Sequence, residues 1–152
     1  MNKRRMRALA KRIAQMPRAK MDRSDKKCTV RGFRMDRYSD DCGTPCCIAG
    51  WAASDFLKKN WNPRMYLDVH KVATQRLGLN EEEAMTLFDP GCGFISLTYT
   101  KVTPKDAARA LMIVVSGETD PAIVWARAIA RQVRLGQLTP HVFNKYGLKV
   151  TV

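Results

Sequence analysis

Apolar residues recur three or four positions apart through most of the chain, which is the spacing of an amphipathic helix. The first such stripe predicts a helix over residues 2–16 that is stopped by Pro17, with the basic residues largely off the stripe. The stripe consists of Met6, Leu9, Ala10, Ile13 and Met16. We therefore expect a helix that buries one face and shows its basic face to solvent, rather than a free basic tail.

Later segments repeat this pattern and carry residues that commonly begin and end helices. Capping residues followed by proline mark several starts, and Gly78 marks the end of a helix over residues 65–77. The glutamates at positions 81–83 suit the first turn of a short helix, because they complement its dipole. The predicted starts are Thr44-Pro45, residue 65, Asn80, Thr103-Pro104, Asp120-Pro121 and Thr139-Pro140.

These elements predict one compact, mostly α-helical domain of five to seven helices over residues 1–152. The basic N-terminal helix and arm, residues 1–37, are expected to dock on a helical core over residues 44–147. Three segments without a clear helical period leave open a small two- or three-stranded β-sheet, and they are residues 28–35, 94–102 and 148–152. The expected core comprises Leu9, Ile13, Ile48, Trp51, Phe56, Val72, Leu87, Phe88, Leu111, Val115, Val124 and Ile129.

The composition fits a globular protein with no membrane partner. Hydrophobic residues make up 45% of the 152 residues, which is enough for a core, and no apolar run approaches the roughly 20 residues of a membrane span. The basic start lacks the apolar run of a secretory signal. Five cysteines, two of them adjacent, make a poor disulfide framework, which favours reduced thiols in the cytoplasm.

Positive charge is concentrated at the N-terminus. Of the formal net charge of +13, residues 1–37 contribute +11, from 14 basic and three acidic residues, and residues 38–152 contribute +2. This asymmetry indicates a polyanionic partner, either nucleic acid or an acidic protein surface, against the alternative of a solvated arm that only aids solubility. The candidate binding residues, which include a second stripe near residue 130, are Lys3, Arg4, Arg5, Arg7, Lys11, Arg12, Arg18, Lys20, Arg31, Arg34, Arg37, Arg127, Arg131 and Arg134.

One cluster carries side chains with notable chemistry. Cys42 and Cys46 have the spacing of one zinc-ligand pair, with Cys47 and His70 as further weak candidates, but no second close pair exists. A thiol near a helix start also suits a nucleophile. We expect the third interpretation, packing as small side chains, because cysteine is among the most buried residue types. No phosphate-binding or hydrolase motif is present, so the sequence predicts no catalytic residue and no cofactor.

The segment from Cys42 to Ala52, C-G-T-P-C-C-I-A-G-W-A, resembles a family of small uncharacterised phage and prophage proteins. That family is built around a C-G-T-x-x-C-I-A-G-W/H-A segment, followed by L-G-L, E-A and L-F-x-P blocks and a T-P-x-x-A-A-R-x-L helix. The later blocks here are Leu77-Gly78-Leu79, Glu83-Ala84, Leu87-Phe88-Asp89-Pro90 and the run from Thr103 to Leu111.

The resemblance covers about residues 1–130, and this chain departs from it in several places. Cys46 and Cys47 are doubled, the N-terminus is more basic, and a stretch at residues 91–102 and a C-terminal tail are added. The resemblance implies a phage or prophage origin and an accessory role in the cytoplasm of a host cell. Such roles include nucleic-acid handling, host takeover and the blocking of a host defence.

Two functional hypotheses follow. In the first, a non-enzymatic phage-type accessory protein contacts nucleic acid or a nucleoprotein through its basic N-terminal third. In the second, the protein inhibits a host defence protein by direct binding to an acidic or nucleic-acid-binding surface. A zinc-binding protein built on cysteine and histidine is a lesser alternative.

Overall fold

The computed structural model describes residues 1–18, 20–21, 28–30, 32–33, 35, 47–57, 66–88 and 102–136. This part of the chain is mostly helical, as predicted, and the expected start at Thr139-Pro140 lies outside it. The helices are α1 (Lys3–Ala14), α2 (Ile48–Leu57), α3 (Tyr66–Leu77), α4 (Glu81–Phe88), α5 (Pro104–Val115) and α6 (Pro121–Arg134). The strands are β1 (Lys20–Met21) and β2 (Cys28–Val30).

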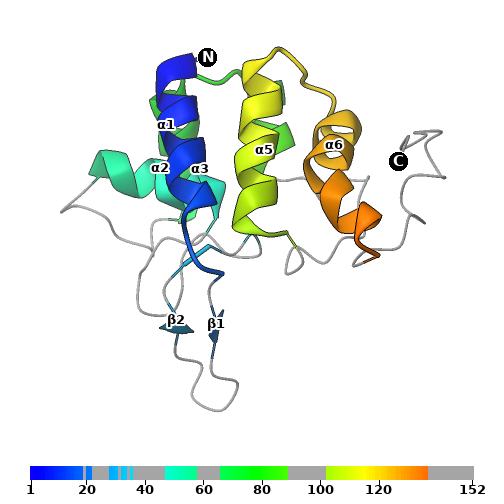
Figure 1. The fold of residues 1–152 in the computed structure, drawn as a ribbon. Coiled ribbons are helices and arrows are strands. Elements are labelled where there is room, and N and C mark those ends of the chain that lie inside the picture. Colours follow the sequence, from blue (N-terminus) through cyan, green and yellow to red (C-terminus); the bar gives the residue numbers. More distant parts are fainter. Residues whose placement is uncertain are drawn as a thin grey trace.

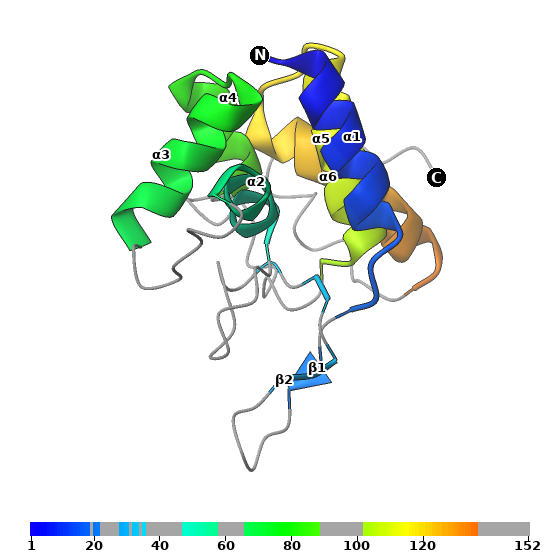
Figure 2. The ribbon, with the colours of Figure 1, turned by 90° about the vertical axis from the view of Figure 1, so that its left-hand side faces the viewer.

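The helices form two layers. α5 lies between α1 and α6 and packs against both of them (Figure 1). α2, α3 and α4 pack against one another on the other side of the core (Figure 2). Since α1 also contacts α2 and α3, and α4 contacts α5 and α6, the two layers share one hydrophobic core.

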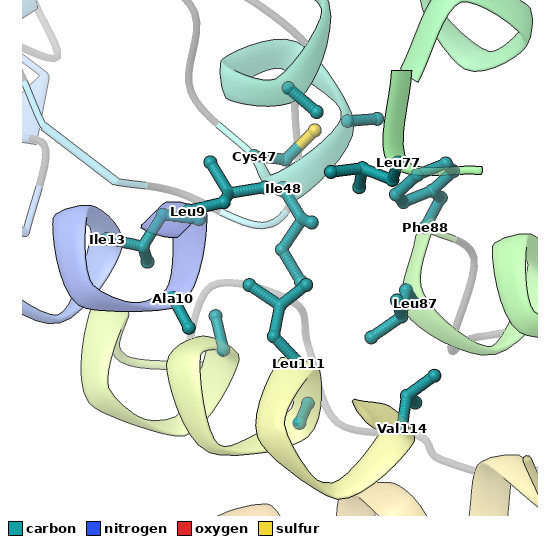
Figure 3. Close-up of a cluster of buried hydrophobic side chains, with 14 of the residues drawn as sticks. Leu9, Ala10, Ile13, Cys47, Ile48, Leu77, Leu87, Phe88, Leu111 and Val114 are labelled. Atoms are coloured by element: carbon teal, nitrogen blue, oxygen red, sulfur yellow. The ribbon is translucent and has the colours of Figure 1, made fainter. Parts of the chain in front are cut away.

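All six of these helices contribute side chains to that core. Figure 3 shows Ile48 of α2 among Leu9 of α1, Leu77 of α3 and Leu111 of α5. Burying a side chain of this size stabilises the fold by about 1.5–3 kcal/mol. The helical spacing correctly placed nine expected core residues, namely Leu9, Ile13, Ile48, Leu87, Phe88, Leu111, Val115, Val124 and Ile129.

The apolar stripe of α1 is buried as predicted. Met6, Leu9, Ala10 and Ile13 face the core, and α1 makes its most extensive contact with α5. α5 is rich in alanine, and small side chains let a neighbouring helix approach closely. The basic helix is therefore fixed to the domain instead of trailing from it.

Helix starts follow the predicted capping chemistry. Asn80 and Glu83 at the start of α4 exchange two hydrogen bonds, of 2.8 and 2.9 Å, between the side chain of one and the backbone N–H of the other. Thr103 and Asp106 form the same reciprocal pair at the start of α5. The Asp120 carboxylate accepts from two backbone N–H groups of α6. Each pair satisfies donors that a helix start would otherwise leave unpaired.

Two buried polar contacts hold α6 in place. Gln132 donates its side-chain amide to the carboxylate of Asp106, which is only 1% exposed. The indole N–H of Trp125 donates to the carbonyl of Thr86 in α4 at 2.7 Å. Because buried polar groups without partners are costly, these contacts fix the rotation of α6 against α5 and α4.

The observed rotations of α6 and α5 correct three expectations from apolar spacing. The spacing along α6 predicts that Ile123 and Val133 face inward, but both are only half-buried, whereas Trp125 is 1% exposed and fills the core. The spacing along α5 predicts that Met112 is buried, but it is 44% exposed.

The other three residues of the expected core are not fully buried or are not described. Trp51 and Val72 are half-buried and pack against the core cluster. The side chain of Phe56 lies outside the described part of the chain. α2 begins at Ile48, with the carbonyl of Cys47 accepting from Trp51, and the expected start at Thr44-Pro45 is also not described.

Of the expected strand over residues 28–35, the described residues include the short β2. It pairs antiparallel with β1, which the sequence did not predict. Residues 94–101 and 148–152 lie outside the described part of the chain, and Val102 is buried but not in a strand. The β1–β2 ribbon lies away from the helical layers (Figure 1).

Two helix-terminating glycines give a matched test of how α1 meets α3. Gly78 and Gly136 have nearly equal φ angles, +62° and +66°. A Cβ atom added at Gly78 would lie 3.2 Å from the backbone nitrogen of Asn2, whereas a Cβ atom added at Gly136 would have no neighbour within 4 Å. Alanine in this left-handed conformation costs about 1–2 kcal/mol. We expect Gly78→Ala to lower the free energy of unfolding more than Gly136→Ala does. Urea unfolding measures both losses, and the m values should not change. Equal losses would contradict the close packing of the start of α1 on the end of α3.

Candidate nucleic-acid interface

The outer face of α1 carries charge that the described structure does not neutralise. Lys3, Arg4, Arg7 and Lys11 are exposed, and none of them forms an ion pair or a side-chain hydrogen bond with another described residue. Residues 1–18 contain seven basic residues and no acidic residue. The predicted basic face is therefore a fixed surface of one sign.

Charge is divided between the two helical layers. α1, α5 and α6, which we call the cationic layer, contain eleven basic residues and one acidic residue, a net charge of +10. α2, α3 and α4 contain two basic and five acidic residues, a net charge of −3. Since a surface of one sign attracts the opposite charge and raises association rates, the cationic layer is the side that a polyanion would approach.

α5 and α6 extend this surface beyond α1. Lys105 is exposed and Arg109 is half-exposed on α5, the helix that lies between α1 and α6 (Figure 1). Arg127, Arg131 and Arg134 are exposed on α6, in agreement with the predicted stripe. Sequence reasoning missed the two basic residues of α5, although their spacing of four places them on one helix face.

Two cations of this layer have acidic neighbours. A guanidinium nitrogen of Arg109 lies 3.4 Å from the Asp106 carboxylate and 3.4 Å from the carbonyl of Ala128. Arg127 lies 3.9 Å from the carboxylate of Glu118. The Arg127–Glu118 pair is solvent-exposed, and exposed pairs contribute about 0–1 kcal/mol, so Arg127 stays accessible to a stronger anionic partner. Arg109 is held more firmly, because its partner Asp106 is buried.

The remaining candidates are only partly described. Arg18 is exposed just beyond α1, where its backbone bridges to Phe33. Phe33 itself is fully buried. The side chain of Lys20, together with Arg31, Arg34 and Arg37, lies outside the described residues.

Arg5 and Arg12 were predicted as partner contacts, and the structure turns both toward α2 and α3. Arg5 donates to the carbonyl of Arg76 at the end of α3, at 3.0 Å. The guanidinium carbon of Arg12 lies 4.8 Å from the ring centre of Trp51. Cations near a helix C-terminus and over an indole ring are both stabilised, so these contacts help to pack α1 on α2 and α3.

Cys47 and His70 occupy structural positions. Cys47 is 3% exposed and its sulfur accepts from the backbone N–H of Gly50 at 3.4 Å, which caps α2. His70 meets Phe88 edge to face, with ring centres 5.1 Å apart. Within the described ranges no three His, Cys, Asp or Glu side chains gather as a metal-ligand set, and Cys42 and Cys46 fall outside those ranges.

None of the helices described here combines the length and apolar character needed to cross a membrane. Comparisons with protein-family models, curated protein sequences and solved structures found no match to this chain. The resemblance to phage and prophage proteins stays a prediction.

The contribution of Arg5 to packing can be tested against its neighbour Arg4, which is also exposed but has no described partner. Arg5→Gln should lower the free energy of unfolding by about 0.3–1 kcal/mol, the value of a cation at a helix C-terminus. Arg4→Gln should leave it nearly unchanged. The measurement is chemical denaturation followed by circular dichroism at low salt, and a loss of stability in Arg4→Gln but not in Arg5→Gln would refute that contribution.

Proposed function

We propose that this protein is a non-enzymatic accessory protein that binds nucleic acid or a nucleoprotein through its cationic layer. The observation that carries the proposal is the outer face of α1, where four basic side chains without described partners stand on a helix fixed to the core. Phosphate backbones bind such surfaces because the neutralised phosphates release condensed counterions.

The dimensions of α1 suit a phosphate backbone. Arg4 and Lys11 are separated by about 10 Å along the helix axis, and duplex DNA carries about six charges over that length. α1 contains no aromatic residue that could stack on bases. Contacts of this kind position a protein on nucleic acid without reading its sequence.

The resemblance to phage and prophage proteins supports an accessory role for such binding. The alternative, an inhibitor of a host defence protein, uses the same charge to reach an acidic protein surface. A pull-down of the tagged protein from host lysate, with and without nuclease, separates the two. Material that disappears on nuclease treatment supports nucleic-acid binding, and a single stoichiometric protein that survives nuclease supports inhibition.

A salt titration tests the proposed surface directly. The variant Arg4→Gln/Arg7→Gln/Lys11→Gln should bind a short DNA duplex more weakly. The slope of log K against log salt should become less negative by up to about 2.7, which is about 0.9 for each phosphate that is no longer neutralised. The weakening should not depend on the base sequence of the duplex. Fluorescence anisotropy at several salt concentrations gives the slope.

A matched control separates the local surface from net charge alone. Lys71→Glu/Gln75→Glu also lowers the net charge by three, but at exposed positions of α3 in the other layer. We expect this control to keep most of the affinity and nearly the full slope. If both variants lose affinity equally, or if wild-type binding is insensitive to salt, the cationic layer is not the binding surface.

A further inference from the structure

A separate pocket lies where α1 meets α2 and α3. Its volume is about 190 Å³, and three arginines line it: Arg5 and Arg12 from α1, and Arg76 from α3. The rest of the lining is apolar, formed by Ala8, Leu9, Ala52 and Leu77. Ala8 and both α1 arginines are exposed, so the pocket opens at the surface.

Two of these arginines are held in place before any ligand arrives. The 3.0 Å hydrogen bond to the carbonyl of Arg76 fixes Arg5, and stacking over Trp51 holds Arg12. Ordering a long side chain normally costs about 0.5–1.5 kcal/mol of binding energy. Here the fold has already covered part of that cost, as in a prepared binding site.

The lining combines two chemistries. Guanidinium groups match the planar geometry of carboxylates and bind them through paired hydrogen bonds. An apolar floor gains free energy only when it covers an apolar group. The occupant that satisfies both is an aliphatic side chain with carboxylates beside it.

We infer that this pocket binds an acidic peptide segment of a partner protein, with one aliphatic side chain on the floor and neighbouring carboxylates on the arginines. The volume fits one side chain, since pockets that enclose a whole small-molecule ligand measure about 300–1,000 Å³. No aromatic residue lines the pocket, so a nucleic-acid base would find no aromatic ring to stack on there. The inference is independent of the proposed function, because it concerns a different flank of α1.

The probe is the acetylated, amidated peptide Asp-Glu-Leu-Glu-Asp, titrated into the full chain and followed by ¹⁵N NMR. We expect shifts of the amides of Leu9, Ala52 and Leu77 at millimolar peptide. The peptide Asp-Glu-Gly-Glu-Asp, equal in charge, should bind at least tenfold more weakly because it lacks the aliphatic side chain. Equal binding of the two peptides would show that only charge is recognised and would overturn the inference.

Variants test the arginines and guard against loss of folding. Arg12→Gln/Arg76→Gln should weaken the leucine peptide at least tenfold, whereas Arg4→Gln/Arg7→Gln, which removes the same charge from the outer face, should weaken it less than threefold. Ala8→Glu introduces a carboxylate at an exposed helical position of the rim and should weaken the peptide without disturbing the fold. Unchanged affinity in both Arg12→Gln/Arg76→Gln and Ala8→Glu would overturn the inference.

Nucleic acid is the competing occupant of the pocket, and a separate titration tests it. If a short single-stranded DNA shifts the same pocket amides, and Arg12→Gln/Arg76→Gln abolishes those shifts, the pocket is part of a nucleic-acid site and the peptide inference is wrong. Duplex binding by wild type and by the outer-face variant is measured in parallel. If the peptide does not bind but the duplex binds in a salt-sensitive way, only the peptide inference is wrong. If the peptide binds but the duplex does not, only the proposed function is wrong.

Discussion

The burial of the apolar stripe of α1 against α5 is the interaction on which the rest of the structure depends. α1 is only 12 residues long, and isolated helices of that length are marginal in water. It also carries six basic residues and no acidic residue, so its own charges oppose compact packing. Met6, Leu9 and Ile13, each at most 4% exposed, offset that repulsion by being removed from water. A charged helix can therefore be displayed in a fixed orientation.

The acidic residues explain why so much positive charge is left at the surface. Glu83 and Asp106 are buried, where they satisfy the first turns of α4 and α5, and Asp106 also receives Gln132 from α6. Asp120 caps α6 in the same way. Most of the basic residues make no such contact in the described structure, and the four on the outer face of α1 form no ion pair with a described residue. The fold thus uses these carboxylates to cap helix starts and leaves the basic groups of Lys3, Arg4, Arg7 and Lys11 facing outward.

Local chemistry made much of this predictable from the sequence. The apolar stripe of α1 repeats at steps of three or four positions, and the caps at Asn80, Thr103 and Asp120 join residues two or three positions apart. Such local patterns can be read from the sequence alone. The burial of Trp125 and the exposure of Met112 depend on how each helix is rotated against its neighbours. That rotation is set by contacts between distant residues, such as the hydrogen bond from Trp125 to Thr86. The arginine pocket was missed for the same reason, since Arg76 lies 64 positions from Arg12 in the chain.

α1 thus presents basic residues on two flanks, and helical geometry keeps these flanks apart. Residues seven apart lie almost on the same side of a helix, so Arg5 and Arg12 face one flank while Arg4 and Lys11 share another about 100° away. An anion held by the first pair would lower the positive potential felt by an anion at the second, because the diameter of a helix with its side chains, roughly 10–12 Å, is close to one Debye length, roughly 8 Å at physiological salt. Binding free energies are reciprocal. A nucleic acid on the outer face and an acidic segment in the pocket would therefore weaken each other without any change of shape, through the charge of α1 alone.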